Sequence, residues 1–133
     1  MYAFIWEWAR ASKYCDGDAL ESRIQPGALL TFEVPGEPPE VMSSDEYMTF
    51  FRKECLYTRW GSFDKSSMSV TVNGDQATVK GRWEGGTLIQ YFFSGHPIKA
   101  VEETQILVRD GDNILLASLH EIAVPDVGKD AAP

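Results

Sequence analysis

The sequence predicts an α+β fold in which a strongly bent, mostly antiparallel sheet encloses three helices. Helical patterns occupy the first 55 residues, and a long series of alternating segments follows them. Short turn sequences such as Asn73-Gly74-Asp75 and Gly111-Asp112-Asn113 separate these later segments. Helices followed by a long meander are typical of a sheet that curls around them. Such a curl leaves a pocket in its mouth, and function is expected there.

The helices are predicted from apolar spacing and from capping residues. Apolar residues at three- and four-residue steps predict a helix over residues 2–14. Two further helices are predicted over 19–25 and from 43 to about 55, because each begins with a capping-box pattern. These patterns are Asp18 with Glu21 and Ser43 with Glu46.

The strands are predicted from alternation between turn sequences. Their expected ranges are 29–34, 67–73, 76–84, 87–94, 98–109 and 113–122. Residues 35–39 form a Pro- and Gly-rich loop. Both faces of the last strand are apolar, so both need cover. We expect helices on one face and a second copy of the chain, in a homodimer, on the outer face. Residues 1–123 form one domain, and 124–133 form a loose tail.

Size and charge limit the classes of partner. A chain of 133 residues fits one domain. The net charge of −8 argues against nucleic acid and against an anionic membrane surface. No apolar run approaches the ~20 residues of a membrane span, so a cytoplasmic location is expected. Cys15 and Cys55 fit no metal spacing and are predicted to be free, buried thiols. With two histidines, we expect neither a metal site nor a cofactor.

Two segments resemble the nuclear transport factor 2-like superfamily, in particular its SnoaL-like and ketosteroid isomerase-like members. They read GDALESRIQPGALLTFEVPGEPPEVMSSDEYMTFFR and VTVNGDQATVKGRW…VEETQILVRDGDNILLAS. The resemblance covers residues 2–122. It implies a cone-shaped sheet wrapped around helices, an apolar pocket in the mouth of the cone, and often a dimer through the outer sheet face.

The resemblance argues against the mechanism of the ketosteroid isomerases. Their aspartate base falls on Val34, with Glu33 before it. Their oxyanion-hole tyrosine falls near Arg10, and their neutral aspartic acid falls on Thr104. SnoaL-type cyclases instead use a carboxylate on the last strand as acid or base, and Glu121 is the residue that matches it.

Two glutamates are the predicted catalytic residues. Glu121 shares a strand face with Leu119, and an inward face would place its carboxylate among aliphatic side chains. Desolvation would then raise its pKa into the range useful for acid/base chemistry. The alternative is that Glu121 lies solvated at the end of the strand. Glu102 lies on the strand face that, by the resemblance, carries pocket-lining residues in the superfamily. Its alternative is a cross-strand pair with Arg82 or Lys80.

Other residues are predicted to bind the substrate. Large aromatic side chains with a few polar groups are typical of pockets for apolar molecules. The predicted lining residues are Trp8, Tyr47, Trp83, Leu119, Glu33 and Thr104. His120 lies on the opposite face from Glu121 and is interpreted as an interface or core residue.

Three functions remain open from the sequence. The first is a cofactor-free acid/base enzyme of the isomerase, cyclase or lyase type, acting on a small apolar carbonyl-bearing or polycyclic molecule. The second is a non-catalytic protein that binds an apolar metabolite in the same pocket. The third is a dimeric interaction module without a ligand. Fold alone does not choose among them.

Overall fold

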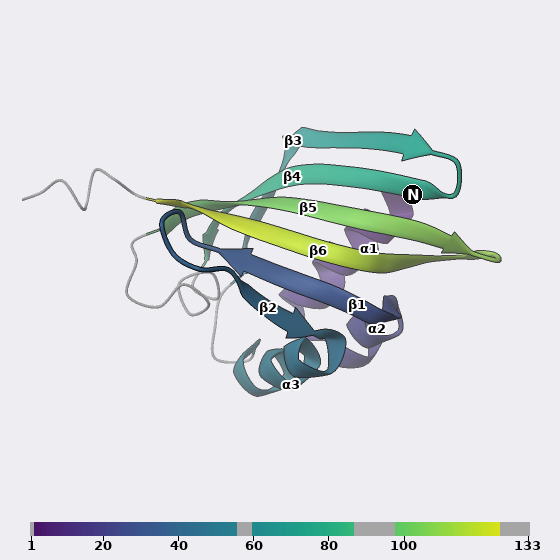
Figure 1. Cartoon of the computed structure of the whole chain (residues 1–133), viewed down its shortest axis with the longest axis horizontal. Coiled ribbons are helices and arrows are strands. Elements are labelled where there is room, and N and C mark those ends of the chain that lie inside the picture. The colour runs from purple at the N-terminus through teal and green to yellow at the C-terminus, as the bar shows by residue number, and fades with distance from the viewer. Residues whose placement is uncertain (1, 56–59, 87–97, 126–133) are drawn as a thin grey trace, which may run out of the picture.

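The computed structural model describes residues 2–55, 60–86 and 98–125, which form an α+β fold as the sequence predicts (Figure 1). The helices lie in the N-terminal half. The elements in chain order are α1 (Tyr2–Lys13), α2 (Gly17–Glu21), β1 (Ile24–Glu33), β2 (Glu40–Ser43), α3 (Ser44–Glu54), β3 (Trp60–Asn73), β4 (Gln76–Gly86), β5 (Ile98–Asp110) and β6 (Asn113–Pro125).

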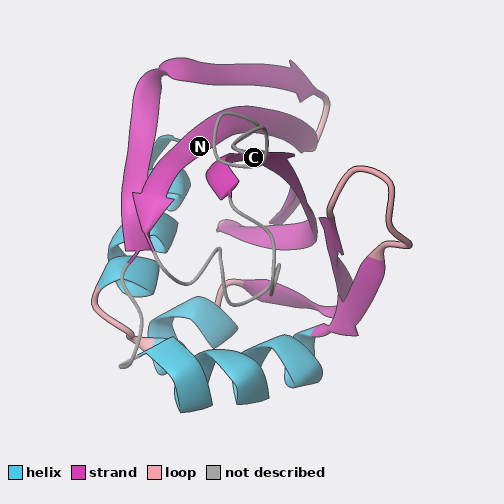
Figure 2. Cartoon of the chain, turned by 90° about the vertical axis from the view of Figure 1, so that its left-hand side faces the viewer, coloured by secondary structure: helices cyan, strands magenta, loops and turns pink. Residues whose placement is uncertain are grey.

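The strands form one mixed sheet in the order β2-β1-β6-β5-β4-β3. Strands β1 and β6 are parallel, and the other neighbours are antiparallel. The sheet curls strongly, and the helices lie on the inside of the curl (Figure 2). In Figure 1 helix α1 lies behind the sheet, so the face toward the viewer is the outer face.

The three predicted helices are confirmed, but α2 begins and ends earlier than predicted. Ser43 and Glu46 form the predicted capping box of α3, with a hydrogen bond in each direction. Helix α2 instead begins after Asp16, whose carboxylate accepts a hydrogen bond from the backbone N–H of Ala19 at 3.1 Å. The predicted capping role of Asp18 is therefore wrong, because the chain already turns into the helix two residues earlier.

Apart from the segment 87–94, the predicted strands are present, and each is longer in the structure than the sequence predicted. Strand β1 begins at Ile24, in a segment predicted to be helical, and β3 begins at Trp60. Strand β2 was not predicted; its four residues pair with β1 between a loop and a helix cap. Strand β6 runs to Pro125, beyond the predicted end of the domain. The strand predicted over 87–94 and the rest of the tail lie outside the described residues.

The core lies between the inner sheet face and the helices. Helices α1 and α3 contribute Phe4, Trp8, Tyr47 and Phe51, each no more than 5% exposed. Aliphatic residues of β1, β5 and β6 oppose them. These include Leu30, Val101, Leu107, Leu116 and Leu119.

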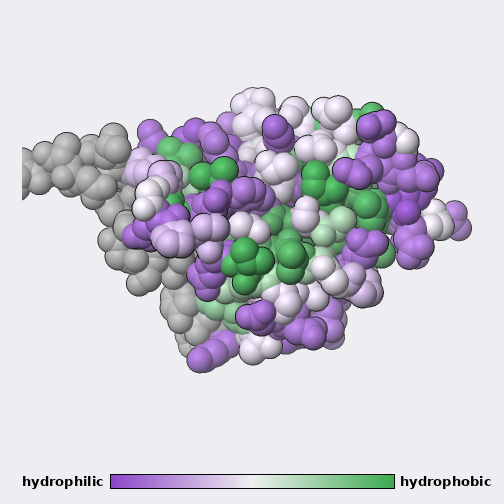
Figure 3. Space-filling model, viewed as in Figure 1, coloured by the Kyte–Doolittle hydropathy of each residue, from purple (hydrophilic) through white to green (hydrophobic). Residues whose placement is uncertain are grey.

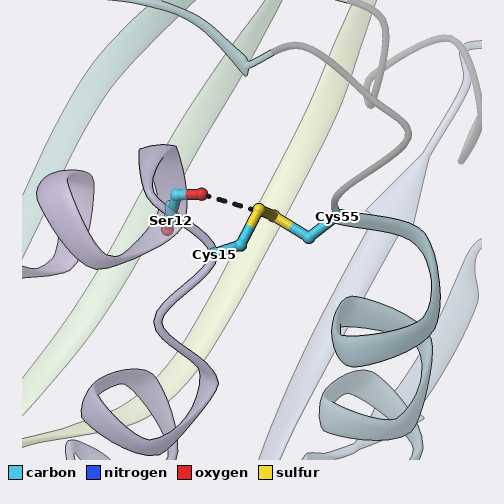
Figure 4. Close-up of a disulfide and its surroundings, with 3 residues drawn as sticks. All are labelled: Ser12, Cys15 and Cys55. Atoms are coloured by element: carbon cyan, nitrogen blue, oxygen red, sulfur yellow. Dashed lines mark hydrogen bonds between the residues drawn. A yellow bond between two sulfur atoms is a disulfide. The ribbon is translucent and has the colours of Figure 1, made fainter.

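The two cysteines form a disulfide, so the prediction of free thiols is wrong. Cys15 follows α1 in a left-handed turn with φ of 57°, and Cys55 ends α3. Their Cα atoms are 5.7 Å apart, which is a normal span for a disulfide. The carbonyl oxygen of Ser12 lies 3.5 Å from Cys55 Sγ (Figure 4). Sequence spacing did not reveal the pair because 40 residues separate its members.

Among the residues that the structure describes, no helix has both the length and the apolar character needed to cross a membrane.

The disulfide is expected to contribute measurably to stability. Replacing both Cys15 and Cys55 by Ser removes a cross-link over a separation of 40 residues. We expect the free energy of unfolding to fall by about 2–4 kcal/mol, because the unfolded chain regains the entropy of the open loop. Urea unfolding with and without a thiol reductant measures the loss. Reductant should weaken the natural chain and leave the double variant unchanged, and a natural chain insensitive to reductant would contradict the expectation.

Candidate functional site

Two buried glutamates face each other on the inner side of the sheet. Glu103 of β5 lies directly opposite Glu121 of β6 in the antiparallel register, and their exposed fractions are 6% and 9%. Along the same row, Phe32 of β1 lies beside Glu121 and Gly81 of β4 lies beside Glu103. The two carboxyl groups therefore share one apolar row across four strands. We call them the carboxyl pair.

Glu103 is the acceptor of the hydrogen bonds at this site. Its Oε2 accepts one from Trp83 Nε1 at 3.2 Å and one from Gln105 Nε2 at 3.3 Å. A further side-chain hydrogen bond joins Glu103 to Glu121. These donors favour the ionised form of Glu103 and leave the shared proton on Glu121.

A glycine allows Trp83 to hold its position. A Cβ atom at Gly81 would lie 2.3 Å from the ring of Phe63, so only glycine leaves room for that ring against β4. Phe63 in turn packs edge-on against Trp83, with ring centroids 5.3 Å apart. This contact fixes the indole whose N–H reaches Glu103.

Burial moves the pKa values of both carboxyl groups upward. Desolvation raises the pKa of Glu103 to about 7, although the hydrogen bonds from Trp83, Glu121 and Gln105 oppose it. Desolvation also raises the pKa of Glu121 well above its usual value, and the charge and hydrogen bond of Glu103 add to the rise. The pair therefore holds one proton near neutral pH, with Glu121 as the acid and Glu103 as the base.

Tyr47 of α3 lies near the carboxyl pair from the helix side. Its pKa is raised by burial and then by the charges of Glu121 and Glu103, so its hydroxyl keeps its proton. The ring stacks between Phe32 and Phe51, with centroid distances of 6.1 and 6.2 Å. The site therefore combines two acids, a phenol and a wall of aromatic rings.

The structure brings several of the predicted residues together. Glu121, Trp83 and Tyr47 surround Glu103, and Leu119 lies opposite Gln105 in the next row of the inner face. Trp8 is also inside the curl, where it is 3% exposed and stacks on Phe4 of its own helix at 6.0 Å.

Three predicted site residues lie on the outer face instead. Glu102 is exposed and stands opposite Arg82, whose ion pair within the described residues is with Glu84 of its own strand. Thr104 stands opposite His120. Glu33 hydrogen bonds to His120 Nε2 on the neighbouring parallel strand. The inward orientation predicted for Glu102 is therefore wrong. The inward-facing glutamate of β5 is the next residue, Glu103.

Sequence reasoning missed Glu103 and Gln105 because the two faces of β5 look alike. Acidic and neutral residues alternate on both faces, so the strand itself does not show which one is inward. The signal lay in β4, where the clean alternation of Ala77, Val79 and Trp83 marks the inner face. The antiparallel register carries that face onto Glu103 and Gln105.

Three surface hollows lined by described residues lie away from the carboxyl pair. The largest, of about 480 Å³, lies between the start of α1 and the β5–β6 turn, with Glu7 and Arg23 on its wall. Arg23 also lines a second hollow, beside α1 and α2. The third lies beside the disulfide and Arg52. Within the described ranges, no cluster of three or more His, Cys, Asp or Glu residues is placed to hold a metal ion.

Comparison with solved structures identifies the fold as nuclear transport factor 2-like. A nuclear transport factor 2-like protein from Cytophaga hutchinsonii matches with a TM-score of 0.68 and 13% identity, over 89% of this chain and 90% of that one. A protein of unknown function with this fold from Silicibacter pomeroyi gives 0.67 and 16%, over 92% of each chain. A ketosteroid isomerase-like protein from Erwinia carotovora atroseptica gives 0.66 and 18%, also over 92% of each.

No protein-family model matches the sequence, and a search of curated proteins finds no significant match. The comparisons therefore support the predicted fold and leave the activity to be argued from the site.

The carboxyl pair is expected to make stability fall as pH rises. A carboxyl whose folded pKa is raised binds its proton more tightly in the folded state, so its stabilising effect is lost as pH rises from the unfolded value of 4.5 through the folded value of about 7. Glu121 contributes in the same direction, because burial raises its pKa in the folded state as well. Glu121→Gln should reduce the slope of unfolding free energy between pH 5 and 8 by about 1.4 kcal/mol per pH unit.

Urea unfolding at four pH values measures this slope. The matched control is Glu102→Gln, one residue from Glu103 but exposed on the outer face, and it should keep the natural slope. Equal slopes for Glu121→Gln and the natural chain would show that Glu121 is solvated in the folded protein.

Proposed function

We propose that this protein is a SnoaL-like pocket protein that acts as a cofactor-free acid/base enzyme on a small, apolar, carbonyl-bearing molecule. The observation that carries the proposal is the carboxyl pair. A carboxylate and a carboxylic acid side by side, in an apolar interior, provide a base and an acid in one place. Stability alone does not explain such a pair, because burying two acids is costly.

The proposed reaction is proton transfer next to a carbonyl group. The Glu103 carboxylate takes a proton from the carbon beside the carbonyl, and the electrons of that C–H bond form a carbon–carbon double bond. Glu121 gives its proton to the carbonyl oxygen, so a neutral enol results. When Glu103 returns its proton to another carbon of the conjugated system and Glu121 recovers the enol proton, the product is an isomer and the enzyme is restored.

The surrounding side chains support these roles. Trp83 and Gln105 donate to Glu103 and favour its ionised form before the reaction. Tyr47 and Trp83 offer apolar surface for a ring-bearing substrate. The base and the acid differ from the predicted pair only in that Glu103 replaces Glu102.

Exchange of the α-protons of 2-tetralone in D₂O, followed by NMR, tests the proposal with a simple polycyclic ketone. Glu121→Gln and Glu103→Gln should each lower the exchange rate by about 10²–10⁴-fold, because each removes a proton donor or acceptor from the transition state. Glu102→Gln should exchange at the natural rate.

Two outcomes separate the alternatives. Binding of the ketone without exchange, unaffected by Glu121→Gln but lost in Tyr47→Ala, favours a non-catalytic binding protein. Neither binding nor exchange across a panel of apolar ketones favours an interaction module.

We also propose that two copies of the chain pair through the outer sheet face. Leu29, Val41 and Ile122 are 54%, 51% and 37% exposed. They lie on the neighbouring strands β1, β2 and β6, around the hydrogen-bonded Glu33 and His120. Apolar side chains gather over this face of the molecule (Figure 3). Exposed apolar groups of this kind often mark an interface.

Ile122→Glu should convert a dimer to a monomer, because it places a charge in the proposed interface. Light scattering after size-exclusion chromatography measures the mass. The matched control is Val72→Glu, which changes a residue that is 62% exposed on β3, away from β1 and β6. A natural chain that is monomeric at high concentration would contradict the proposal.

A further inference from the structure

The carboxyl pair is surrounded by an excess of hydrogen-bond acceptors. Two donors of the site, Trp83 Nε1 and Gln105 Nε2, both point to Oε2 of Glu103. The proton of the pair is held between Glu103 and Glu121. Among the described residues of the site, the acceptor without a donor is the amide oxygen of Gln105.

Gln105 provides an independent sign that a donor is missing. Its side chain is 2% exposed, and its Oε1 atom accepts no hydrogen bond within the described part of the chain. The amide donates to Glu103 through its other atom, Nε2, so the unpartnered oxygen belongs to a side chain that is already part of this site. A buried carbonyl oxygen normally has a donor, from protein, water or ligand.

The charge of the pair is likewise uncompensated among the described residues. The ion pairs within the described ranges join Arg23 with Glu7, Arg52 with Asp18 and Glu21, Arg82 with Glu84, and His120 with Glu33. None of them includes Glu103 or Glu121. A buried carboxylate is normally paired with a cation.

We infer that this site binds an organic cation, a protonated amine carried on a small apolar body. An ammonium N–H group supplies the donor that Gln105 Oε1 lacks, and the positive charge balances the carboxylate. The apolar body lies against the aromatic side chains of Tyr47 and Trp83. The inference rests on the same carboxyl pair as the proposed enzyme, but it requires no turnover.

An ammonium group suits the site better than the other ligand classes. A neutral ketone brings only an acceptor, so it leaves Gln105 Oε1 without a donor. A Ca²⁺ or Mg²⁺ ion needs about six oxygen ligands, and the described residues offer no cluster of three ligating side chains. An amine with an apolar body needs only a few acceptors and a wall of rings. A substrate with both a carbonyl group and such a nitrogen would serve the proposed reaction as well.

Three probes of the same shape test the inference at pH 7. They are 1-naphthylmethylamine, 1-naphthalenemethanol and 1-naphthoic acid, which present a cation, a neutral group and an anion on one ring system. Titration calorimetry should give an affinity at least tenfold higher for the amine than for the alcohol, and weakest for the acid. A ligand bound only by the folded chain also raises the melting temperature.

Variants assign the preference to the site. Glu103→Gln should reduce the ratio of amine to alcohol affinity to below about threefold. Gln105→Leu, which keeps a similar volume and both carboxyl groups, should weaken the amine more than the alcohol, because hydrogen bonds from a charged donor are the stronger ones. It serves as the second variant where Glu103→Gln fails to fold. Glu102→Gln on the outer face should keep the natural ratio.

Amine binding should also release protons to the buffer, because a cation favours the ionised form of both acids. The titratable groups that face the site in the described structure are Glu103 of β5, Glu121 of β6 and Tyr47 of α3. Calorimetry in two buffers of different ionisation enthalpy measures the release. Glu121→Gln should reduce it.

The inference is overturned if the alcohol binds as tightly as the amine. It is equally overturned if Ca²⁺ or Mg²⁺ stabilises the protein and the amine does not. Exchange of 2-tetralone protons without a preference for the amine overturns this inference and leaves the proposed enzyme standing. A preference for the amine without any exchange supports this inference and contradicts the proposed enzyme.

Discussion

The register between β5 and β6 is the constraint on which the rest of the site depends. It places Glu103 directly opposite Glu121 on the inner face of the sheet. At this spacing two carboxyl groups cannot both ionise without strong repulsion, so they share a proton. A shift of one residue in either strand would turn one acid outward and remove the pair. The position of the carboxyl pair is therefore set by strand pairing.

The strands on either side of this pair are arranged to support it. On one side, Gly81 makes room for Phe63, which holds the indole of Trp83 against Glu103. On the other side, the parallel pairing of β1 with β6 places Phe32 beside Glu121. The carboxyl pair thus lies between a hydrogen-bonding side and a purely apolar side. This asymmetry favours the ionised form of Glu103 and the protonated form of Glu121.

Local patterns predicted the helices and the fold, because capping boxes and alternation are encoded within a few residues. Of the residues predicted for a site, Glu121, Trp83 and Tyr47 lie on the inner side, and their functional roles stay predictions. They failed where the answer depended on distant segments. The face of β5 is set by its pairing with β4, so Glu102 was chosen in place of its neighbour. The disulfide depends on how the ends of α1 and α3 pack together. No local sequence pattern near Cys15 indicates that packing.

The energetics of the pair argue for a functional origin. Two buried acids with raised pKa values weaken the folded state at neutral pH, and apolar side chains of similar size would fill the same row at lower cost. The fold offsets this cost elsewhere, through a large aromatic core and a disulfide that ties two helix ends together. Neither compensation supplies a positive charge to the carboxyl pair. A ligand that supplies donors and positive charge would remove the cost directly, so the pair is better understood as one half of a binding interaction than as part of the scaffold.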